Sequence, residues 1–130
     1  MNIKTPCSIA LIAALAIGTA HASCTYPKAP KKLPQGKSAT LEEMTAAQKA
    51  VKEFDTAIND YVTCLQTEND AAVAQVSQRE SDPKKAEAQT KKMNAALAKK
   101  QNAAIDADKA LAERFNEQLR VYKARDANKG

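Results

Sequence analysis

Tryptophan is absent from this 130-residue chain, and glycine, histidine and aromatic residues are scarce. The chain has three glycines and one histidine, and its aromatic residues make up 4% of the sequence. So few aromatic residues and glycines argue against a sheet protein with a large core, whereas abundant alanine favours helices. A chain of this length allows one domain. We therefore expect an all-α protein with a small core.

Residues 1–22 have the pattern of an export signal. Lys4 precedes an apolar run over residues 9–17, and Ala-His-Ala at residues 20–22 is an A-x-A cleavage site before Ser23. The apolar run is shorter than the roughly 20 residues that cross a bilayer. We predict cleavage before Ser23, or alternatively before His21, leaving no stable membrane span. The mature protein would be exported, with the periplasm as the expected compartment and an extracellular location as the alternative.

Loss of this signal peptide would remove side chains on which most enzymes depend. His21 is the only histidine, so the predicted mature chain lacks the usual general base and imidazole metal ligands. Gly36 stands alone, so no glycine-rich loop can cradle a phosphate. Carboxylates such as Asp106 and Asp108 are neighbours along a helix and do not converge. We predict a protein that is not an enzyme, with no catalytic, cofactor-binding or metal site.

Two cysteines, Cys24 and Cys64, remain in the predicted mature chain once Cys7 is lost with the leader. They lack the C-x-x-C spacing of redox and zinc sites. An even number of cysteines in an exported chain favours a disulfide. We predict an intramolecular bridge between Cys24 and Cys64, with two free thiols or intermolecular bridges as the alternatives.

Residues 23–39 are rich in proline and lysine. Three prolines exclude a helix there and favour polyproline II, whose three-residue repeat aligns Pro27, Pro30 and Leu33 on one edge. Extended at about 3.1 Å per residue, the chain from Thr40 back to Cys24 reaches up to about 50 Å, enough to run beside a helix and meet Cys64. We predict an extended strap tied by the disulfide. A disordered linker is the alternative.

Two long amphipathic helices are expected after this strap. Thr40 and Glu43 form a capping box, and Asp82 before Pro83 signals a second helix start. We predict a helix over about 40–79, a turn at 80–82, a second helix over about 83–125 and a tail at 126–130. Similar lengths and a short connection predict an antiparallel two-helix hairpin, in which paired residue numbers add to about 164. The residues that form the two apolar stripes are Met44, Ala47, Val51, Phe54, Ile58, Tyr61, Leu65 and Ala72, and Met93, Leu97, Ala104, Ala107, Leu111, Phe115 and Tyr122.

Charge is divided between the two predicted helices. Residues 40–79 carry seven acids and three bases, whereas residues 83–130 carry six acids and twelve bases. We expect ion pairs between the helices to neutralise most of this charge.

A row of lysines recurs every seven residues beside the second apolar stripe: Lys85, Lys92 and Lys99. Such a row could bind an anionic partner, such as an envelope polymer or lipid headgroups. We expect a solvated, internally paired face instead. No aromatic residues are interleaved for base stacking, so we predict no nucleic-acid partner.

The first part of the predicted mature chain resembles a group of small exported proteobacterial proteins of unknown function that have an N-terminal Cys/Pro-rich segment. The resemblance covers the first third to half of that chain and implies a bacterial envelope protein, without indicating an active site. It rests on these motifs: Cys24-x-Tyr26-Pro27-x-x-Pro30, Leu33-Pro34-x-Gly36, Ala39-Thr40, Glu43-Met44, Ala47-Gln48-x-x-Val51-Lys52 and Tyr61-x-x-Cys64-Leu65.

These features together predict a non-catalytic structural or protein-interaction module. Two helices pack along a single seam, and many of the seam residues are alanines that contribute little per residue. We therefore expect a protein partner or self-association. The alternative function is a chaperone-like holdase for envelope proteins.

Overall fold

The computed structural model describes residues 23–128, which form two α-helices and no strand. Helix α1 spans Leu41–Arg79 and helix α2 spans Pro83–Ala127. The all-helical prediction is confirmed, whereas the predicted signal peptide at residues 1–22 lies outside the described residues. Within the described part, neither helix has an apolar stretch long enough to cross a bilayer.

Both helices begin at capping residues. The Thr40 hydroxyl accepts a hydrogen bond from the Glu43 N–H at 3.1 Å, and the Glu43 carboxylate accepts one from the Thr40 N–H at 2.7 Å. The Asp82 carboxylate accepts a hydrogen bond from the Lys84 N–H at 3.0 Å, and Pro83 occupies the first turn. These contacts satisfy N–H groups that have no partner inside the helix. Local sequence therefore determines where each helix starts.

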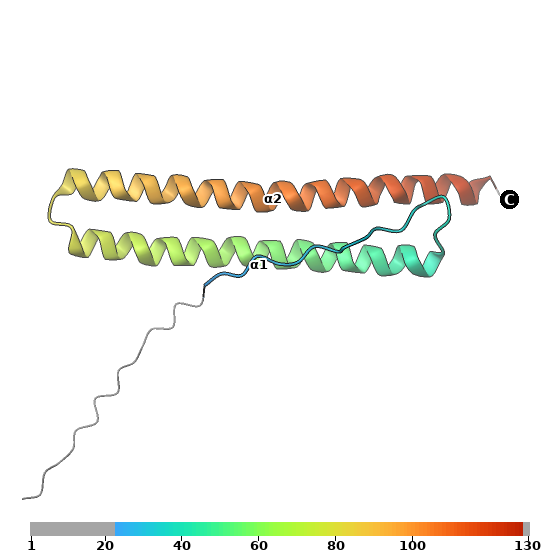
Figure 1. Cartoon of the computed structure of the whole chain (residues 1–130), viewed down its shortest axis with the longest axis horizontal. Coiled ribbons are helices and arrows are strands. Elements are labelled where there is room, and N and C mark those ends of the chain that lie inside the picture. The colour runs from blue at the N-terminus through green and yellow to red at the C-terminus, as the bar shows by residue number, and fades with distance from the viewer. Residues whose placement is uncertain (1–22, 129–130) are drawn as a thin grey trace, which may run out of the picture.

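Helices α1 and α2 lie side by side and are joined at one end by residues 80–82 (Figure 1). Three hydrogen bonds between described residues cross the seam between them, one of which runs from the Gln101 amide to the Gln66 side-chain oxygen at 3.4 Å. The Gln101 amide donates to the Val62 carbonyl at 3.4 Å, and the Asn69 amide donates to the Asn94 amide oxygen at 2.8 Å. The residue numbers add to 163 for Val62 with Gln101 and for Asn69 with Asn94, and to 167 for Gln66 with Gln101, all near the expected value of about 164.

The buried core occupies only one half of this helix pair, the half that contains the start of α1 and the end of α2. Ile58 and Leu111 are its most completely buried large side chains, at 2% and 1% exposure. Along the continuous stretch from residue 66 to residue 103, all of which the structure describes, no residue is buried. The buried apolar residues are Ala39, Met44, Val51, Phe54, Ile58, Leu65, Ala104, Leu111 and Phe115.

Candidate binding groove

Residues 23–39, called here the N-terminal segment, run along one face of the helix pair (Figure 1). At one end of this segment the Gly36 N–H donates a hydrogen bond to the Gln118 side-chain oxygen at 2.9 Å. At the other end Cys24 forms a disulfide with Cys64, with the two Cα atoms 5.8 Å apart. The cysteine pairing predicted from the sequence is the one that the structure has. The segment is thus attached to α2 near one end and to α1 at the other.

Apolar side chains of the N-terminal segment face the helices. The Tyr26 ring packs edge-on against Tyr61, with centroids 5.2 Å apart, and Leu33 packs against the buried core. Pro27 and Pro30 are half-buried, whereas the lysines of the segment are exposed. This division is what a three-residue repeat produces. The segment therefore covers apolar surface of the groove between α1 and α2.

Arg125 holds the other end of this segment against the start of α1. Its guanidinium donates hydrogen bonds to the carbonyls of Ala39 at 2.9 Å and Lys37 at 3.3 Å. The same group lies over the Tyr122 ring, 4.7 Å from its centroid, and pairs with Asp126 at 3.0 Å. These contacts connect the last turns of α2 to the residues that precede α1.

The carboxylate of Glu68 lies beside the disulfide. Glu68 Oε1 accepts a hydrogen bond from the Cys24 N–H at 3.1 Å. One ligand atom from each of Cys24, Cys64 and Glu68 lies within 4.8 Å of the others, the only such metal-ligand cluster within residues 23–128. Metals bind cysteine as thiolate, and here the two sulfurs are bonded to each other. The cluster therefore acts as an anchor for Cys24.

Beyond Cys24 the same face of the helix pair continues, and no described residue of the N-terminal segment covers it. On α1, Tyr61, Cys64 and Glu68 contact the segment, and positions 72, 75 and 79 follow on that face at helical spacing. Two hollows lie there, of about 260 and 340 Å³, each lined by both helices. We call this stretch the open half-groove and the part lined by residues 23–39 the closed half-groove.

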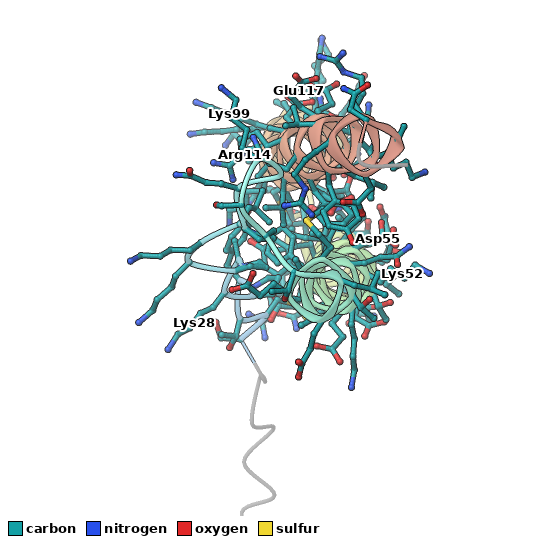
Figure 2. The ribbon with its side chains drawn as sticks, turned by 90° about the vertical axis from the view of Figure 1, so that its right-hand side faces the viewer. Lys28, Lys52, Asp55, Lys99, Arg114 and Glu117 are labelled. Atoms are coloured by element: carbon teal, nitrogen blue, oxygen red, sulfur yellow. A yellow bond between two sulfur atoms is a disulfide. The ribbon has the colours of Figure 1, made fainter. Side chains whose placement is uncertain are left out.

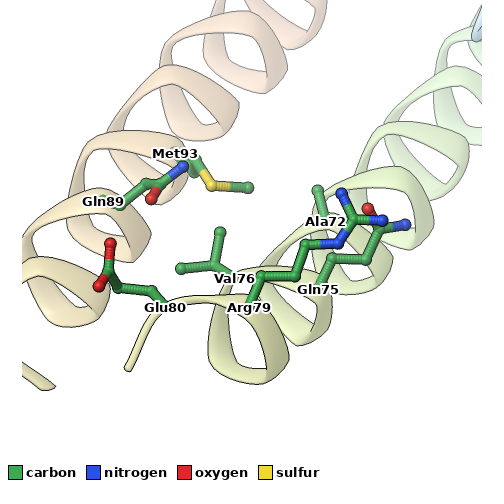
Figure 3. Close-up of a pocket in the computed structure, with 7 residues that line it drawn as sticks. All are labelled: Ala72, Gln75, Val76, Arg79, Glu80, Gln89 and Met93. Carbon is green, nitrogen blue, oxygen red and sulfur yellow. The ribbon is translucent and has the colours of Figure 1, made fainter. Parts of the chain in front are cut away.

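The floor of the open half-groove is apolar and incompletely covered. Figure 3 shows Val76 of α1 and Met93 of α2 pointing toward each other in the larger hollow. Met93 also lines the smaller hollow together with Leu97, so the two hollows adjoin. All three of these side chains are only half-buried. The open half-groove thus exposes the seam that residues 23–39 cover elsewhere.

The predicted lysine row lies along the α2 edge of the open half-groove. Figure 2 shows Lys99 on the same side of the helix pair as Lys28 of the N-terminal segment, with Asp55 on the opposite side. Lys92 and Lys85 precede Lys99 by seven and fourteen residues and so share its edge of the helix. All three lysines of the row are exposed.

The lysines of the row form no ion pairs within residues 23–128. The ion pairs there join Lys49 to Glu53, Arg120 to Glu117 and Arg125 to Asp126, each within one helix. The expectation that ion pairs between the helices answer most of the charge is therefore wrong. The reason is geometric, since the seam-facing positions of both helices carry mainly apolar and amide side chains. The three lysines of the row are therefore exposed and have no carboxylate partner at ion-pair distance within residues 23–128.

Two acidic residues line the open half-groove, and both are already hydrogen-bonded to backbone. Glu68 accepts from the Cys24 N–H, and Glu80 accepts from the Asp82 N–H at 3.1 Å. Lys100, by contrast, lines the smaller hollow without an ion pair in the described part of the chain. The groove is therefore bordered by lysines without ion pairs in the described residues and by two carboxylates that each accept a backbone N–H.

The opposite face of the helix pair is polar. Asp108 is half-buried there beside Asp55 of α1, and its Oδ1 atom is shielded from solvent. Burial first, and then hydrogen bonding and repulsion from Asp55, raise the pKa of Asp108 above its usual 3.8.

Protein-family models, curated proteins and solved structures contain no match to this chain. The groove must therefore be interpreted from its own geometry. The sequence indicated the lysine row and the cysteine pair. It did not indicate the open half-groove, because that feature depends on where a non-helical segment stops along the helices. The nearest signal was the length of residues 24–40, which is sufficient to reach Cys64.

Proposed function

We propose that this protein is an exported, non-catalytic interaction module whose open half-groove receives part of a partner protein. The observation that carries the proposal is that one groove is half lined by the protein's own N-terminal segment and half open. In the closed half, Tyr26 packs on Tyr61 of α1 and Leu33 packs on the buried core; in the open half, Val76 and Met93 are only half-buried and no described residue of the N-terminal segment lies over them. An apolar seam that continues past its own cover is a surface suited to a partner.

The architecture that we propose is an antiparallel hairpin with residues 23–39 as a strap. The hydrogen bonds between Val62 and Gln101 and between Asn69 and Asn94 support this arrangement, because both pairs fit one register. The disulfide supports the strap by holding its far end against the middle of α1. Because the strap is attached at both ends, the point at which it stops covering the helix pair is set by the Cys24–Cys64 bond.

Export is the second part of the proposal. The leader pattern of residues 1–22 supports it, and so does the disulfide, since disulfides persist in oxidising compartments. We propose the periplasm as the compartment, in agreement with the resemblance to envelope proteins. Intact-mass measurement of protein from the envelope fraction should give a chain that begins at Ser23. A chain that retains Met1 would contradict export by this route.

Site-specific cross-linking tests the binding surface. A photoreactive amino acid in place of Gln89, which lines the larger hollow, should give a covalent adduct with a partner in the native envelope. The same substitution at Asn116, exposed elsewhere on α2, is the matched control. Adding Met93→Asp to the Gln89 probe should remove the adduct, because it places a charge on the apolar floor. Equal adduct yields from Gln89 and Asn116 would refute the proposal.

A holdase is the alternative function, favoured by the lack of any buried residue from 66 to 103. A half-exposed apolar seam could hold non-native segments of many envelope proteins. The discriminating measurement is aggregation of a reduced, unfolding client protein at stoichiometric ratios. Suppression that is unaffected by Met93→Asp would place such an activity outside the groove.

Self-association is a further arrangement that the exposed apolar residues permit. Tyr26, Leu41 and Ile105 are exposed by 46%, 69% and 37%, but they belong to three different parts of the described chain. Scattered residues make a weak interface. Sedimentation over a hundredfold concentration range would reveal an oligomer if one forms. We propose a heterologous partner ahead of a second copy.

A further inference from the structure

We infer that the partner of the open half-groove is an acidic amphipathic helix, which lies between α1 and α2 with its acidic flank along Lys85, Lys92 and Lys99. This inference rests on the proposed interaction function and specifies the chemistry of the ligand. The expected occupant is a helix that belongs to another protein.

The shape of the open half-groove fits a third helix. Both of its hollows are bounded by α1 on one side and by α2 on the other, and Met93 lines both. From Glu68 to Arg79 the α1 edge is about 17 Å long at about 1.5 Å per residue, which corresponds to a helix of about twelve residues. Apolar side chains spaced by three or four residues on such a helix would enter the two hollows in turn.

The floor of the groove has the composition of an adaptable apolar surface. Val76 and Leu97 provide branched aliphatic side chains, and Met93 lies between them at the junction of the hollows. The unbranched thioether of methionine adjusts to side chains of different shapes. The incoming helix would therefore have to present aliphatic residues, without a requirement for one particular type.

The edge of the groove selects the charge of the ligand. Lys92, Lys99 and Lys100 have no ion pairs within residues 23–128, and Lys100 borders the smaller hollow. The carboxylates at the groove, Glu68 and Glu80, already accept backbone N–H groups. Acidic residues beside the apolar stripe of an incoming helix would meet unpaired lysines. This is the charge complementarity that gives specificity and fast association.

The same charges disfavour a second copy of this protein as the occupant. A second hairpin docked groove to groove would bring its own lysine row against Lys85, Lys92 and Lys99. A second N-terminal segment would bring Lys28 and its neighbouring lysines to the same edge. Like charges that face each other across an interface are unfavourable.

A designed peptide tests the inference directly. The probe is a fluorescein-labelled helix of fifteen residues, with leucines at spacings of three and four and glutamates on both flanks of the leucine stripe. Its anisotropy would be measured against the oxidised, full mature protein at low salt. We expect saturable binding that weakens as salt is added, since exposed charges are screened. A peptide with lysine in place of every glutamate should not bind.

Two charge-reversal variants distinguish binding through the lysine row from a general effect of the protein's net charge. Lys92→Glu combined with Lys99→Glu should weaken binding of the acidic peptide by about tenfold or more. Lys109→Glu combined with Lys123→Glu makes the same change in net charge at exposed sites on the same helix, and it should change binding by less than about twofold. Circular dichroism and melting temperature would establish that both variants fold as the parent does.

Four results would overturn the inference. They are equal binding of the acidic and lysine peptides, equal losses in the two double variants, binding to anionic phospholipid vesicles without binding to the peptide, and a dimer that Lys92→Glu and Lys99→Glu disrupt. A cross-link from position 89 that depends on Met93, without peptide binding, would leave the proposed interaction function standing and remove only the acidic helix. Loss of both the cross-link from position 89 and the binding of the peptide would contradict the interaction function and the acidic-helix inference together.

Discussion

At the scale of single residues, Gly36 brings the backbone of the N-terminal segment close against α2. A Cβ atom at this position would collide with the Gln118 carbonyl oxygen and would lie 2.8 Å from the Tyr122 nitrogen and 2.9 Å from the Val121 Cβ. Gly36 does not have a positive φ, so the requirement for glycine is steric. Two of the three obstructing atoms belong to the α2 backbone, which cannot shift without disturbing the helix.

The Gly36→Ala variant should therefore be destabilised by about 1–3 kcal/mol, the usual cost of forcing extra volume into a packed site. Urea unfolding of the oxidised protein measures the change. Lys37→Ala, at the exposed neighbouring residue, serves as the control and should change stability little. An unchanged unfolding midpoint for Gly36→Ala would show that the segment does not press against α2 at this point.

Asp108 is a second residue whose surroundings predict a measurable effect. Burial and Asp55 raise its pKa above the usual 3.8, so the folded protein binds the Asp108 proton more tightly than the unfolded chain does. The stabilising contribution of this group is therefore complete below about pH 3.8. It is lost as the pH rises through the folded pKa. At neutral pH the ionised carboxylate is destabilising.

Replacing Asp108 with asparagine should raise the free energy of unfolding at pH 7, because a neutral amide relieves the burial and the repulsion from Asp55 that disfavour the carboxylate. The gain should shrink toward zero below about pH 3.8, where Asp108 is protonated in both states. Urea unfolding at the two pH values measures it, with Asp106→Asn at an exposed position as control. A gain that is independent of pH would assign the effect to helix propensity instead.

At the scale of elements, each helix depends on its first turn. The Asp82 carboxylate accepts hydrogen bonds from the N–H groups of Lys84 and Lys85 at the start of α2. Asp82→Ala should cost about 1 kcal/mol in stability, as loss of an N-cap does, and should fray the first turn of α2. Ser81→Ala, one residue earlier, is the matched control. Equal effects of the two substitutions on the thermal midpoint would mean that the cap contributes nothing.

The elements also show which features could be predicted from the sequence. Capping residues and heptad spacing act within a few residues of chain, so the starts at Thr40 and Asp82 were predictable. The Cys24–Cys64 pair was predictable from chain reach. Unpaired lysines at positions 92 and 99 were not, because ion pairing depends on how the two helices rotate about the seam. The raised pKa of Asp108 likewise depends on a residue 53 positions earlier, which no local pattern reveals.

At the scale of the whole molecule, stability should be unequal between the two halves of the helix pair. All buried apolar residues lie in the half that the N-terminal segment lines, and none lies between 66 and 103. Amide hydrogen exchange should therefore be faster in residues 66–79 and 83–103 than in residues 51–65 and 104–118, because local opening is easier where little is buried. Mass spectrometry of peptic fragments measures this. Uniform protection along both helices would contradict it.

The disulfide should contribute to the closed half in particular. It closes a loop across a sequence separation of 40 residues, worth about 4 kcal/mol in the chain-entropy account. Reduction should lower the thermal midpoint and speed exchange in residues 51–65, with little change in residues 83–103. A reduced protein with the same midpoint would mean that Tyr26, Leu33 and Gly36 hold the segment unaided.

The point on α1 at which Cys24 is attached, Cys64, also leaves the helix pair a length that can change in steps of seven residues. The N-terminal segment extends along α1 only as far as Cys64, to which Cys24 is bonded. The parts of α1 and α2 between that point and residues 80–82 are therefore held together only by the packing of one helix against the other. Removing seven residues from each helix on either side of residues 80–82 would keep the apolar stripes in phase and leave the fastened end unchanged. The reach of the molecule beyond its disulfide is therefore free to vary by heptads, each about 10 Å long.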